Sequence, residues 1–361
     1  MREPDGSRVS HYDYDLPPGR VARYPAPRRD ESRVLVVPRG GGSFRHLRFR
    51  QVADLFRPGD LLVVNESKVL PARLLGRKPT GAPAEILLLR PAPAAADPHV
   101  WEALVRPGGK LKPGRVVEVS EDLKVEILES AAGGGRVVRL VCPGSVEAAL
   151  ERHGHVPLPP YLEREDEPLD RERYQTVYAR TPGSVAAPTA GLHFTPEVLD
   201  ALETKGVARA AVTLHVGVGT FRPVEVEDPR DHELHAEWYE VPPSVAVAVA
   251  AARAAGGRVW AVGTTAVRTL EVMAAEDGRV RAGTGTTDLF VRPPYRFRVV
   301  DALLTNFHLP RSTLLMLVAA LGGYRQVMDA YREAVAGDYR FYSYGDAMAV
   351  VPGGVAEPSG S

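Results

Sequence analysis

Ser184-Val-Ala-Ala-Pro-Thr-Ala-Gly-Leu-His-Phe-Thr195 surrounds a single imidazole, His193, with small, apolar and hydroxyl side chains. The stretch runs directly into a predicted helix. Thr195 suits the N-cap, Pro196 suits the first helical position, and Gly206 ends the helix. The free N–H groups and partial positive charge at a helix start favour anionic ligand groups. We therefore predict a ligand loop here. The alternative is a tightly packed connection whose histidine hydrogen-bonds a backbone carbonyl.

Helical and extended patterns alternate on the C-terminal side of this loop. The predicted order is helix 196–205, strand 207–216, helix 244–255, strand 258–262, a helix after Thr265, strand 297–304, and helices 312–321 and 324–335. Alternation of this kind is typical of an α/β domain whose helices cover a sheet.

A different pattern occupies the region from about Leu74 to Val141, where short apolar runs are separated by Gly- and Pro-containing turns. This spacing predicts a small antiparallel barrel or sandwich. The segment 61–64, in contrast, has the pattern of a buried strand. We therefore predict an α/β main domain formed by residues 1–60 and 153–361, with an inserted small antiparallel β-barrel domain at 61–152.

The composition is that of an ordinary globular enzyme, with 361 residues, 44% hydrophobic and 25% charged. There is no apolar run of about eighteen residues, so no membrane span is expected, and the N-terminus lacks the apolar core of a signal peptide. Cys142 is the only cysteine, which excludes an intramolecular disulfide, a Cys-rich zinc site and a cysteine-ligated iron–sulfur cluster. We expect a cytoplasmic location.

The formal net charge is zero, but the charges are unevenly distributed. Acidic residues concentrate at 163–172 and 225–240. Arginines crowd the N-terminal segment: Arg20, Arg23, Arg28, Arg29, Arg33, Arg39, Arg45, Arg48 and Arg50. A basic region of this kind can bind nucleic-acid phosphates while the whole molecule stays neutral. Alternatively, these arginines only solvate the surface.

Several other segments carry polar side chains where apolar core residues would be expected. The segment 214–221 (Leu-His-Val-Gly-Val-Gly-Thr-Phe) ends a predicted strand in two glycines, as at strand ends where α/β proteins bind ligands. In 262–271, a strand, a Gly-Thr-Thr turn and a helix carry Arg268 and Glu271 three residues apart. These two side chains form a structural ion pair, or the guanidinium holds a carboxylate or phosphate.

Two C-terminal segments repeat this arrangement. The segment 305–318 places Asn306, His308 and Arg311 before an apolar helix. The segment 339–348 gathers aromatic side chains around Arg340 and Asp346, which suits stacking of an unpaired base, although a packed C-terminal cap is an alternative.

The segment His232-Glu-Leu-His-Ala-Glu-Trp238 raises the alternative of a metal site, but no fourth ligand is indicated. The chain has neither the glycine- and lysine-containing phosphate loop nor the nucleophile elbow of the hydrolases.

Taken together, these segments closely resemble the S-adenosylmethionine:tRNA ribosyltransferase-isomerases of queuosine biosynthesis. The resemblance covers essentially all of residues 11–351. It rests on 14–18 (Tyr-Asp-Leu-Pro-Pro), 57–75, 174–178 (Tyr-Gln-Thr-Val-Tyr), 184–195, 214–221, 232–238, 263–271, 305–318 and 339–348.

The resemblance implies a reaction and two substrates. The ribosyl part of S-adenosylmethionine is transferred to 7-aminomethyl-7-deazaguanine at the wobble position of a tRNA anticodon loop. It is isomerised there to give epoxyqueuosine, with loss of adenine and methionine. It also implies that S-adenosylmethionine is a co-substrate and that neither a metal nor a redox cofactor takes part.

The chemistry and the motif positions together suggest roles for named residues. A base must remove an acidic proton beside the sulfonium, and a donor must assist adenine. The catalytic candidates are His193 first, then His215, His308 and Asp346. The candidates for binding S-adenosylmethionine are Ser184, Thr189, Gly191, Gly217, Gly219, Thr220, Gly263, Thr264, Thr265 and Arg268, with Arg268 on the methionine carboxylate. The candidates for binding the RNA substrate are Asn306, Arg311, Arg340, Tyr342 and Tyr344.

Three alternatives to this function stay open from the sequence. A methyltransferase uses the same co-substrate but leaves S-adenosylhomocysteine. A non-catalytic RNA-binding module yields no product, and a metal hydrolase built on His232 and His235 loses activity with a chelator.

Overall fold

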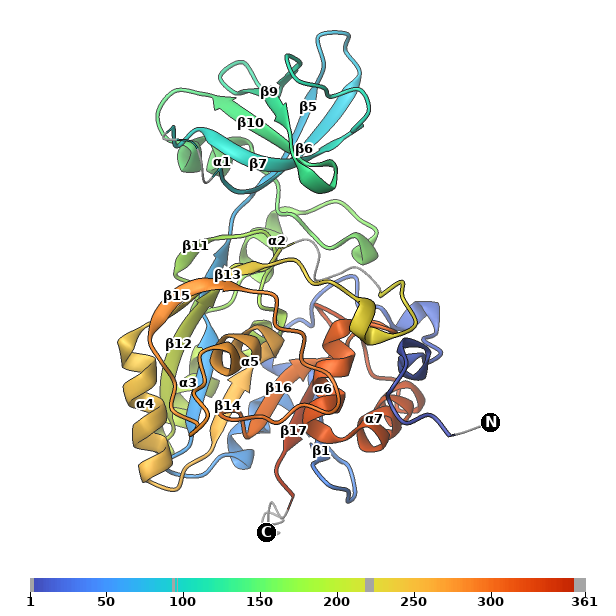
Figure 1. Cartoon of the computed structure of the whole chain (residues 1–361), viewed down its shortest axis with the longest axis vertical. Helices are drawn as coiled ribbons and strands as arrows, with labels where there is room; N and C mark the ends of the chain where they lie inside the picture. The colour runs from blue at the N-terminus through green and yellow to red at the C-terminus, as the bar shows by residue number, and fades with distance from the viewer. Residues whose placement is uncertain (1–2, 93–94, 96, 218–223, 354–361) are drawn as a thin grey trace.

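The computed structural model describes residues 3–353 except 93–94, 96 and 218–223. Within these residues, nine strands form a mixed sheet in the order β15-β13-β12-β3-β14-β16-β17-β1-β2 (Figure 1). Their bounds are β1 Arg33–Pro38, β2 Arg45–Arg48, β3 Leu61–Asn65, β12 Ala208–Leu214, β13 Glu237–Val241, β14 Val259–Val262, β15 Gly283–Thr287, β16 Ala302–Asn306 and β17 Ala347–Val351.

The central strands β12, β3, β14 and β16 run parallel to one another. All five residues of β3 are buried, because the two faces of the strand pack into different cores. Leu61 and Val63 belong to the core beneath four helices, α4 Pro243–Ala254, α5 Gly263–Val272, α6 Thr313–Gly322 and α7 Tyr324–Ala336. Leu62 and Val64 belong to the core on the opposite face, beneath α3 Pro196–Thr204 and the 3₁₀ helix η4 Phe49–Leu55. Burial on both faces explains the continuous apolar sequence of this strand.

The inserted unit is a closed antiparallel barrel of six described strands in the order β10-β7-β6-β5-β8-β9. Their bounds are β5 Arg73–Arg77, β6 Pro83–Pro91, β7 Val100–Arg106, β8 Val116–Glu118, β9 Lys124–Ser130 and β10 Arg136–Val141. The short helix α1 Val146–His153 packs onto the core of the barrel. The predicted fold class, an α/β unit with an inserted antiparallel barrel, is therefore confirmed.

Two short parallel strands, β4 Ser67–Val69 and β11 Thr181–Ser184, lie where the chain enters and leaves the barrel region, and α2 Pro168–Arg173 follows the barrel in the chain. Strand pairing places β3 in the large sheet, so the barrel strands begin at Arg73 rather than at residue 61. The domain bounds given above stay a prediction.

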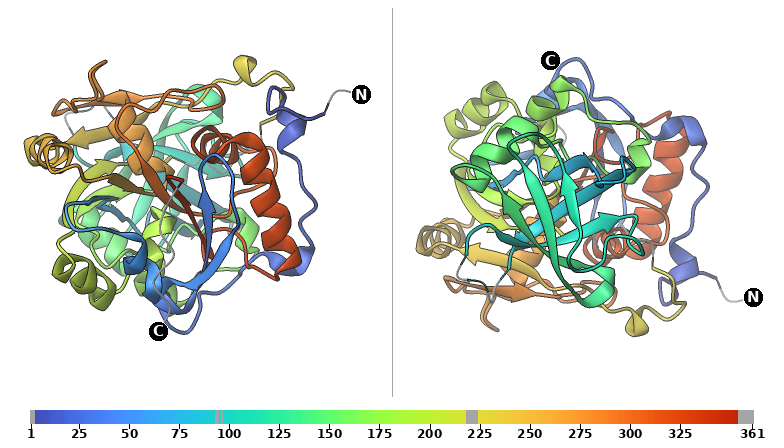
Figure 2. Two further views of the ribbon diagram at one scale, coloured as in Figure 1. Left: turned by 90° about the horizontal axis from the view of Figure 1, so that it is seen from below. Right: turned by 90° about the horizontal axis from the view of Figure 1, so that it is seen from above.

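The carboxyl ends of the four parallel strands point toward the barrel, because β3 leads through β4 into it (Figure 1). Strand β17 is antiparallel to β16 and parallel to β1, so the amino ends of β17 and β1 lie at the same edge. In the view from above, the barrel lies over this edge (Figure 2). We call it the carboxyl-end edge.

Most predicted elements are present within one or two residues of their predicted bounds. The Thr195 side chain accepts a hydrogen bond from the backbone N–H of Val198, and Gly206 has a φ of 81°, as an N-cap and a helix stop require. The predicted strand 297–304 is wrong at its start, since β16 begins at Ala302. No helix in the described ranges is both long and apolar enough to cross a membrane.

Candidate functional site

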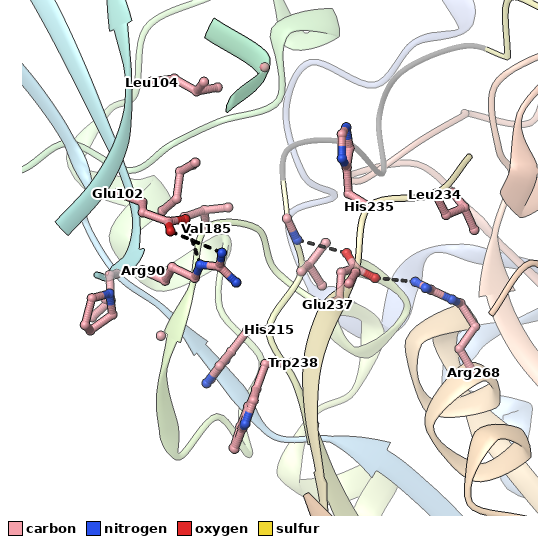
Figure 3. A pocket seen from close by; sticks show the side chains of 18 of the residues that line it. Arg90, Glu102, Leu104, Val185, His215, Leu234, His235, Glu237, Trp238 and Arg268 are labelled. Carbon is pink, nitrogen blue, oxygen red and sulfur yellow. Dashed lines mark hydrogen bonds and ion pairs between the residues drawn. The ribbon is translucent and has the colours of Figure 1, made fainter. Parts of the chain in front are cut away.

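A cavity of about 770 Å³ lies between the barrel and the carboxyl-end edge (Figure 3). We call it the barrel–sheet cavity. The barrel contributes Leu89, Arg90, Trp101, Glu102 and Leu104, and the larger unit contributes Gly183, His215, Gly217, Glu237, Trp238 and Arg268, among others. Its volume is within the usual range for small-molecule sites, which are mostly apolar with a few polar groups.

A buried ion pair lies at one side of this cavity. The Glu237 carboxylate accepts a hydrogen bond from the backbone N–H of Gly217 at 2.9 Å and pairs with the Arg268 guanidinium (Figure 3). Arg268 also donates to the carbonyls of Leu289 and Thr287, at 3.0 and 3.2 Å. Both charged side chains are 6% exposed, and each partner offsets the desolvation of the other.

This arrangement excludes the ion pair of Arg268 with Glu271, which was one of the two alternatives for these side chains. The Glu271 carboxylate instead accepts the backbone N–H groups of Arg298, Val299 and Val300, at 2.9 to 3.0 Å. These bonds also explain the late start of β16, because the N–H groups of 298–300 bind a side chain and not a neighbouring strand.

His215 lies at the end of β12 and lines the barrel–sheet cavity. Its ring stacks on Trp238, with ring centroids 4.9 Å apart and planes at 19°. Its Nδ1 atom is buried and has no hydrogen-bond partner among the described residues. Burial lowers the pKa of His215, so the ring is neutral at neutral pH.

The backbone of Gly183 packs closely against one side of the His215 imidazole. Its φ is 135°, and a Cβ atom at this position would lie 2.7 Å from His215 Nε2. A side chain here is excluded both by backbone conformation and by space, so glycine is required for the observed position of the ring.

A second cavity, of about 60 Å³, lies at the ends of β14 and β16, and we call it the threonine cavity. Val216 and Leu314 line both this cavity and the barrel–sheet cavity. The predicted site residues that line it are Thr189, Gly263, Thr264, Thr265, Asn306, His308 and Tyr342.

The start of α5 forms one wall of the threonine cavity. Gly263 has a φ of 84°, and no side chain caps the helix start. Thr265 accepts a hydrogen bond from the Asn65 side chain at 3.2 Å, which ties α5 to the end of β3. The free backbone N–H groups of α5 therefore lie beside the cavity, where they favour an electron-rich ligand atom.

His193 lies in the 3₁₀ helix η7 Thr189–His193, and both of its ring nitrogens are hydrogen-bonded. Nδ1 lies 2.7 Å from the Ser32 hydroxyl, and Nε2 lies 3.1 Å from the Asn306 amide nitrogen. The same amide donates to the Tyr342 carbonyl, so its nitrogen faces the ring, and Nε2 is the acceptor. The ring is therefore neutral with its proton on Nδ1.

Burial lowers the pKa of His193 to about 4, and nearby Asp346 opposes this shift only in part. His193 lines a third cavity, of about 20 Å³, and not the barrel–sheet cavity. Its contacts are those of a packed histidine, although its partners are side chains rather than the carbonyl considered above. A catalytic role for His193 stays a prediction.

The remaining catalytic candidates are also engaged in hydrogen bonds. His308 Nε2 lies 2.8 Å from the Thr305 hydroxyl, and burial lowers its pKa to about 3. Asp346 accepts the backbone N–H groups of Arg33 and Arg340 at 2.8 Å, and it pairs with the Arg33 side chain at 3.1 Å. Of the four candidates, His215 alone lines the barrel–sheet cavity among the described residues.

Two candidates for binding the co-substrate are enclosed by the fold. The Ser184 hydroxyl donates to the Ala186 carbonyl at 2.7 Å and accepts the Val216 N–H at 3.0 Å. At Gly191, a Cβ atom would lie 2.1 Å from the Tyr178 hydroxyl, so this glycine serves close packing. Gly219 and Thr220 lie outside the described residues.

The candidates for the RNA substrate are divided between different places. Tyr342 lines the threonine cavity and has a φ of 71°, an uncommon conformation that its backbone hydrogen bonds hold. Arg340 and Tyr344 line the third cavity, where the Tyr344 hydroxyl donates to Asp170 at 2.8 Å. Arg311 lines none of the three cavities.

The sequence did not reveal the residues that the barrel contributes, since nothing in Trp101, Arg90 or Glu102 sets them apart from other strand residues. Glu237 and Trp238 lie in the segment 232–238 considered as a metal site. Among the described residues, there is no group of three His, Cys, Asp or Glu side chains placed to hold a metal ion.

Comparisons with known proteins agree over nearly the whole chain. Residues 9–350 match the family model described as queuosine biosynthesis protein. The S-adenosylmethionine:tRNA ribosyltransferase-isomerase of Symbiobacterium thermophilum is 54% identical over 95% of this chain and 100% of its own length. The protein of the same name from Pelotomaculum thermopropionicum is 53% identical over 95% and 99%.

A solved structure is also similar. The crystal structure of S-adenosylmethionine tRNA ribosyltransferase from Thermotoga maritima has 39% sequence identity and a TM-score of 0.54, covering 94% of this chain and 99% of that chain.

Proposed function

Because the chain belongs to the queuosine biosynthesis family of S-adenosylmethionine:tRNA ribosyltransferase-isomerases, we propose that it catalyses that reaction. It transfers the ribosyl group of S-adenosylmethionine to 7-aminomethyl-7-deazaguanine at the wobble position of tRNA. It isomerises the sugar to give epoxyqueuosine and releases adenine and methionine. A cytoplasmic location and the lack of a prosthetic group stay predictions from the sequence.

The observation that carries this proposal is the barrel–sheet cavity at the carboxyl-end edge. Its volume of about 770 Å³ has room for a nucleoside-sized co-substrate beside an extruded base. Trp238 and Phe290 offer aromatic faces for bases, and the Glu237–Arg268 pair supplies a fixed dipole. The adjoining threonine cavity adds hydroxyl and N–H donors for sugar oxygens.

We assign His215 as the general base of this reaction. The positive sulfur of S-adenosylmethionine acidifies the hydrogens on the neighbouring C5′ carbon, and a neutral imidazole can accept one of them. The electron pair left on C5′ is then available for the carbon–carbon bond that closes the carbocycle. The lowered pKa of His215 keeps it neutral at neutral pH, and its ring lines the barrel–sheet cavity, where it can contact a bound substrate.

Other groups assist the departure of the leaving groups. Adenine leaves with the electron pair of its glycosidic bond and takes up a proton, for which the protonated His215 is a donor within the same cavity. Methionine leaves as a neutral thioether. Two N–H groups of Arg268 remain after its three hydrogen bonds, and these can hold the methionine carboxylate.

The test is incubation of the protein with S-adenosylmethionine and a tRNA that carries the aminomethyl deazaguanine, followed by mass analysis of the digested nucleosides. We expect epoxyqueuosine together with free adenine and methionine. Formation of S-adenosylhomocysteine would instead indicate a methyltransferase, and binding of tRNA without any product would indicate a non-catalytic module.

A further inference from the structure

The third cavity is lined by three arginines from segments far apart in the sequence. Arg29 lies in the N-terminal segment, Arg173 ends α2, and Arg340 follows α7. We call this place the arginine cavity. Ser32, His193, Ser343 and Tyr344 complete its polar lining.

None of the three guanidinium groups forms an ion pair with a carboxylate in the described part of the chain. Arg29 donates to the carbonyls of Glu172 and Leu192, at 2.8 and 3.1 Å. Arg173 donates to the carbonyls of Ala26 and Pro27, at 2.7 and 3.1 Å, and its Nε atom is buried with no partner. The Arg340 side chain makes no hydrogen bond to any described residue.

The carboxylates near these arginines are already paired with other cations. Asp346 pairs with Arg33 at 3.1 Å, and Asp170 pairs with Arg164 at 2.7 Å. Both carboxylates are almost fully buried, at 2% exposed. Burial lowers the pKa of Arg29, and the positive charge of Arg173 lowers it further. Three half-buried cations therefore share a small space without a counter-charge of their own.

In contrast, four of the nine N-terminal arginines already have a carboxylate partner. Arg20, Arg23, Arg28 and Arg33 each pair with a carboxylate. The number of arginines in a segment therefore does not indicate where an anion binds. Guanidinium groups without a carboxylate partner indicate it better.

We propose that the arginine cavity binds a backbone phosphate of the tRNA substrate, an inference that rests on the proposed function. A volume of about 20 Å³ accepts phosphate oxygens but not a nucleoside. Arginine groups bind phosphate oxygens through paired N–H donors, and the two non-bridging oxygens of a phosphodiester can accept hydrogen bonds from more than one guanidinium. The phosphate is that of a nucleotide flanking the modified base.

The position of the cavity is consistent with a flanking phosphate. It shares Ser343 with the threonine cavity and shares no lining residue with the barrel–sheet cavity. A phosphate bound here is therefore close to, but separate from, the space assigned to S-adenosylmethionine and the base.

The test compares Arg340→Gln with Arg281→Gln, a matched control on an exposed arginine outside the N-terminal basic segment. Loss of the Arg340 charge breaks no hydrogen bond between described residues, so the variant is expected to fold. The probe is an unmodified tRNA transcript, whose Kd is measured over a range of salt concentrations. We expect binding by R340Q to weaken roughly tenfold and its salt slope to fall by about one, while R281Q binds normally.

The other outcomes overturn the proposal. An unchanged Kd for R340Q removes the phosphate site, and an equal loss in R281Q shows only general electrostatic attraction. A raised KM for S-adenosylmethionine with unchanged tRNA binding identifies a site for the methionine carboxylate instead. The nucleoside analysis of the unmutated protein separates these results from failure of the proposed function, because it does not depend on Arg340.

Discussion

The imidazole of His215 differs from those of His193 and His308 in its surroundings. The other two rings are held by neighbouring side chains, whereas His215 Nδ1 has no partner in the described ranges. We expect His215→Asn to lower kcat at least about a hundredfold, as loss of a general base does, without changing the melting temperature. The measurement is release of labelled adenine in single turnovers.

A matched control is His235→Asn, which alters an exposed histidine on the same cavity. It should retain near-normal turnover. In the unmutated enzyme, activity should decline only on the acid side, as the lowered pKa of His215 is approached. If His215→Asn turns over normally, another group removes the proton.

For His193 and His308 we predict an effect on the stability of the fold rather than on turnover. Their pKa values are about 4 and about 3 in the folded protein, below the ordinary value of 6.5. The unfolded chain therefore binds more protons between these values, and the free energy of unfolding falls as the pH drops from about 6.5 to about 4. Each histidine contributes up to about 1.4 kcal/mol per pH unit.

Chemical denaturation at several pH values can test this dependence. His193→Asn should be less stable at neutral pH, because Ser32 and Asn306 lose their partner, yet its stability should depend less steeply on pH. An unchanged pH slope would show that His193 is not a buried neutral ring. A hundredfold loss of turnover in His193→Asn without any loss of stability would instead support a catalytic role for His193.

The sequence indicated which residue types carry the chemistry but not which of them are free to act. The small side chains around His193 were read as a ligand loop, yet Ser184 and Gly191 are enclosed by local packing. Whether an imidazole has a partner depends on residues distant in the chain, such as Ser32 and Asn306. Those contacts follow from the tertiary structure and have no local pattern.

Local signals predicted the helices well because they act within one turn. Thr195 caps α3 through the N–H three residues later, and Ser312 caps α6 in the same way. The segment 297–301 has the pattern of a strand because it contains Phe297 and the β-branched pair Val299 and Val300. Its backbone N–H groups nevertheless donate to the Glu271 carboxylate of α5. No local sequence pattern predicts this interaction.

This role of Glu271 leads to a stability prediction. Glu271→Ala leaves three backbone N–H groups, two of them buried, without their acceptor and should lower the free energy of unfolding by roughly 2–4 kcal/mol. The measurement is urea-induced unfolding at neutral pH. Glu276→Ala, which alters an exposed carboxylate shortly after the same helix, is the control and should have almost no effect. Equal stabilities for both variants would contradict this role.

Each of the two units could be predicted separately, because each has its own repeating pattern of apolar residues. Their contact could not, since the residues that meet across the barrel–sheet cavity come from 89–147 on one side and from Leu70 and 182–317 on the other. The carboxyl-end edge of a parallel sheet is a common place for ligands. In this molecule the edge is only one wall, and the barrel supplies the opposite wall (Figure 3).

If the barrel wall shapes the site, a larger side chain there should impair catalysis without harming the fold. Leu104 of β7 lines the cavity and is partly exposed, and its cross-strand partner Leu87 of β6 does not line it. Leu104→Trp should lower kcat/KM at least about tenfold by filling space that the substrates need, whereas Leu87→Trp should leave it nearly unchanged. Both melting temperatures should stay close to that of the unmutated protein, because both side chains are only partly buried and neither is one of the buried residues of the barrel core. Equal activity of the two variants would mean that the substrates bind only along the sheet edge and that the barrel does not form part of the site.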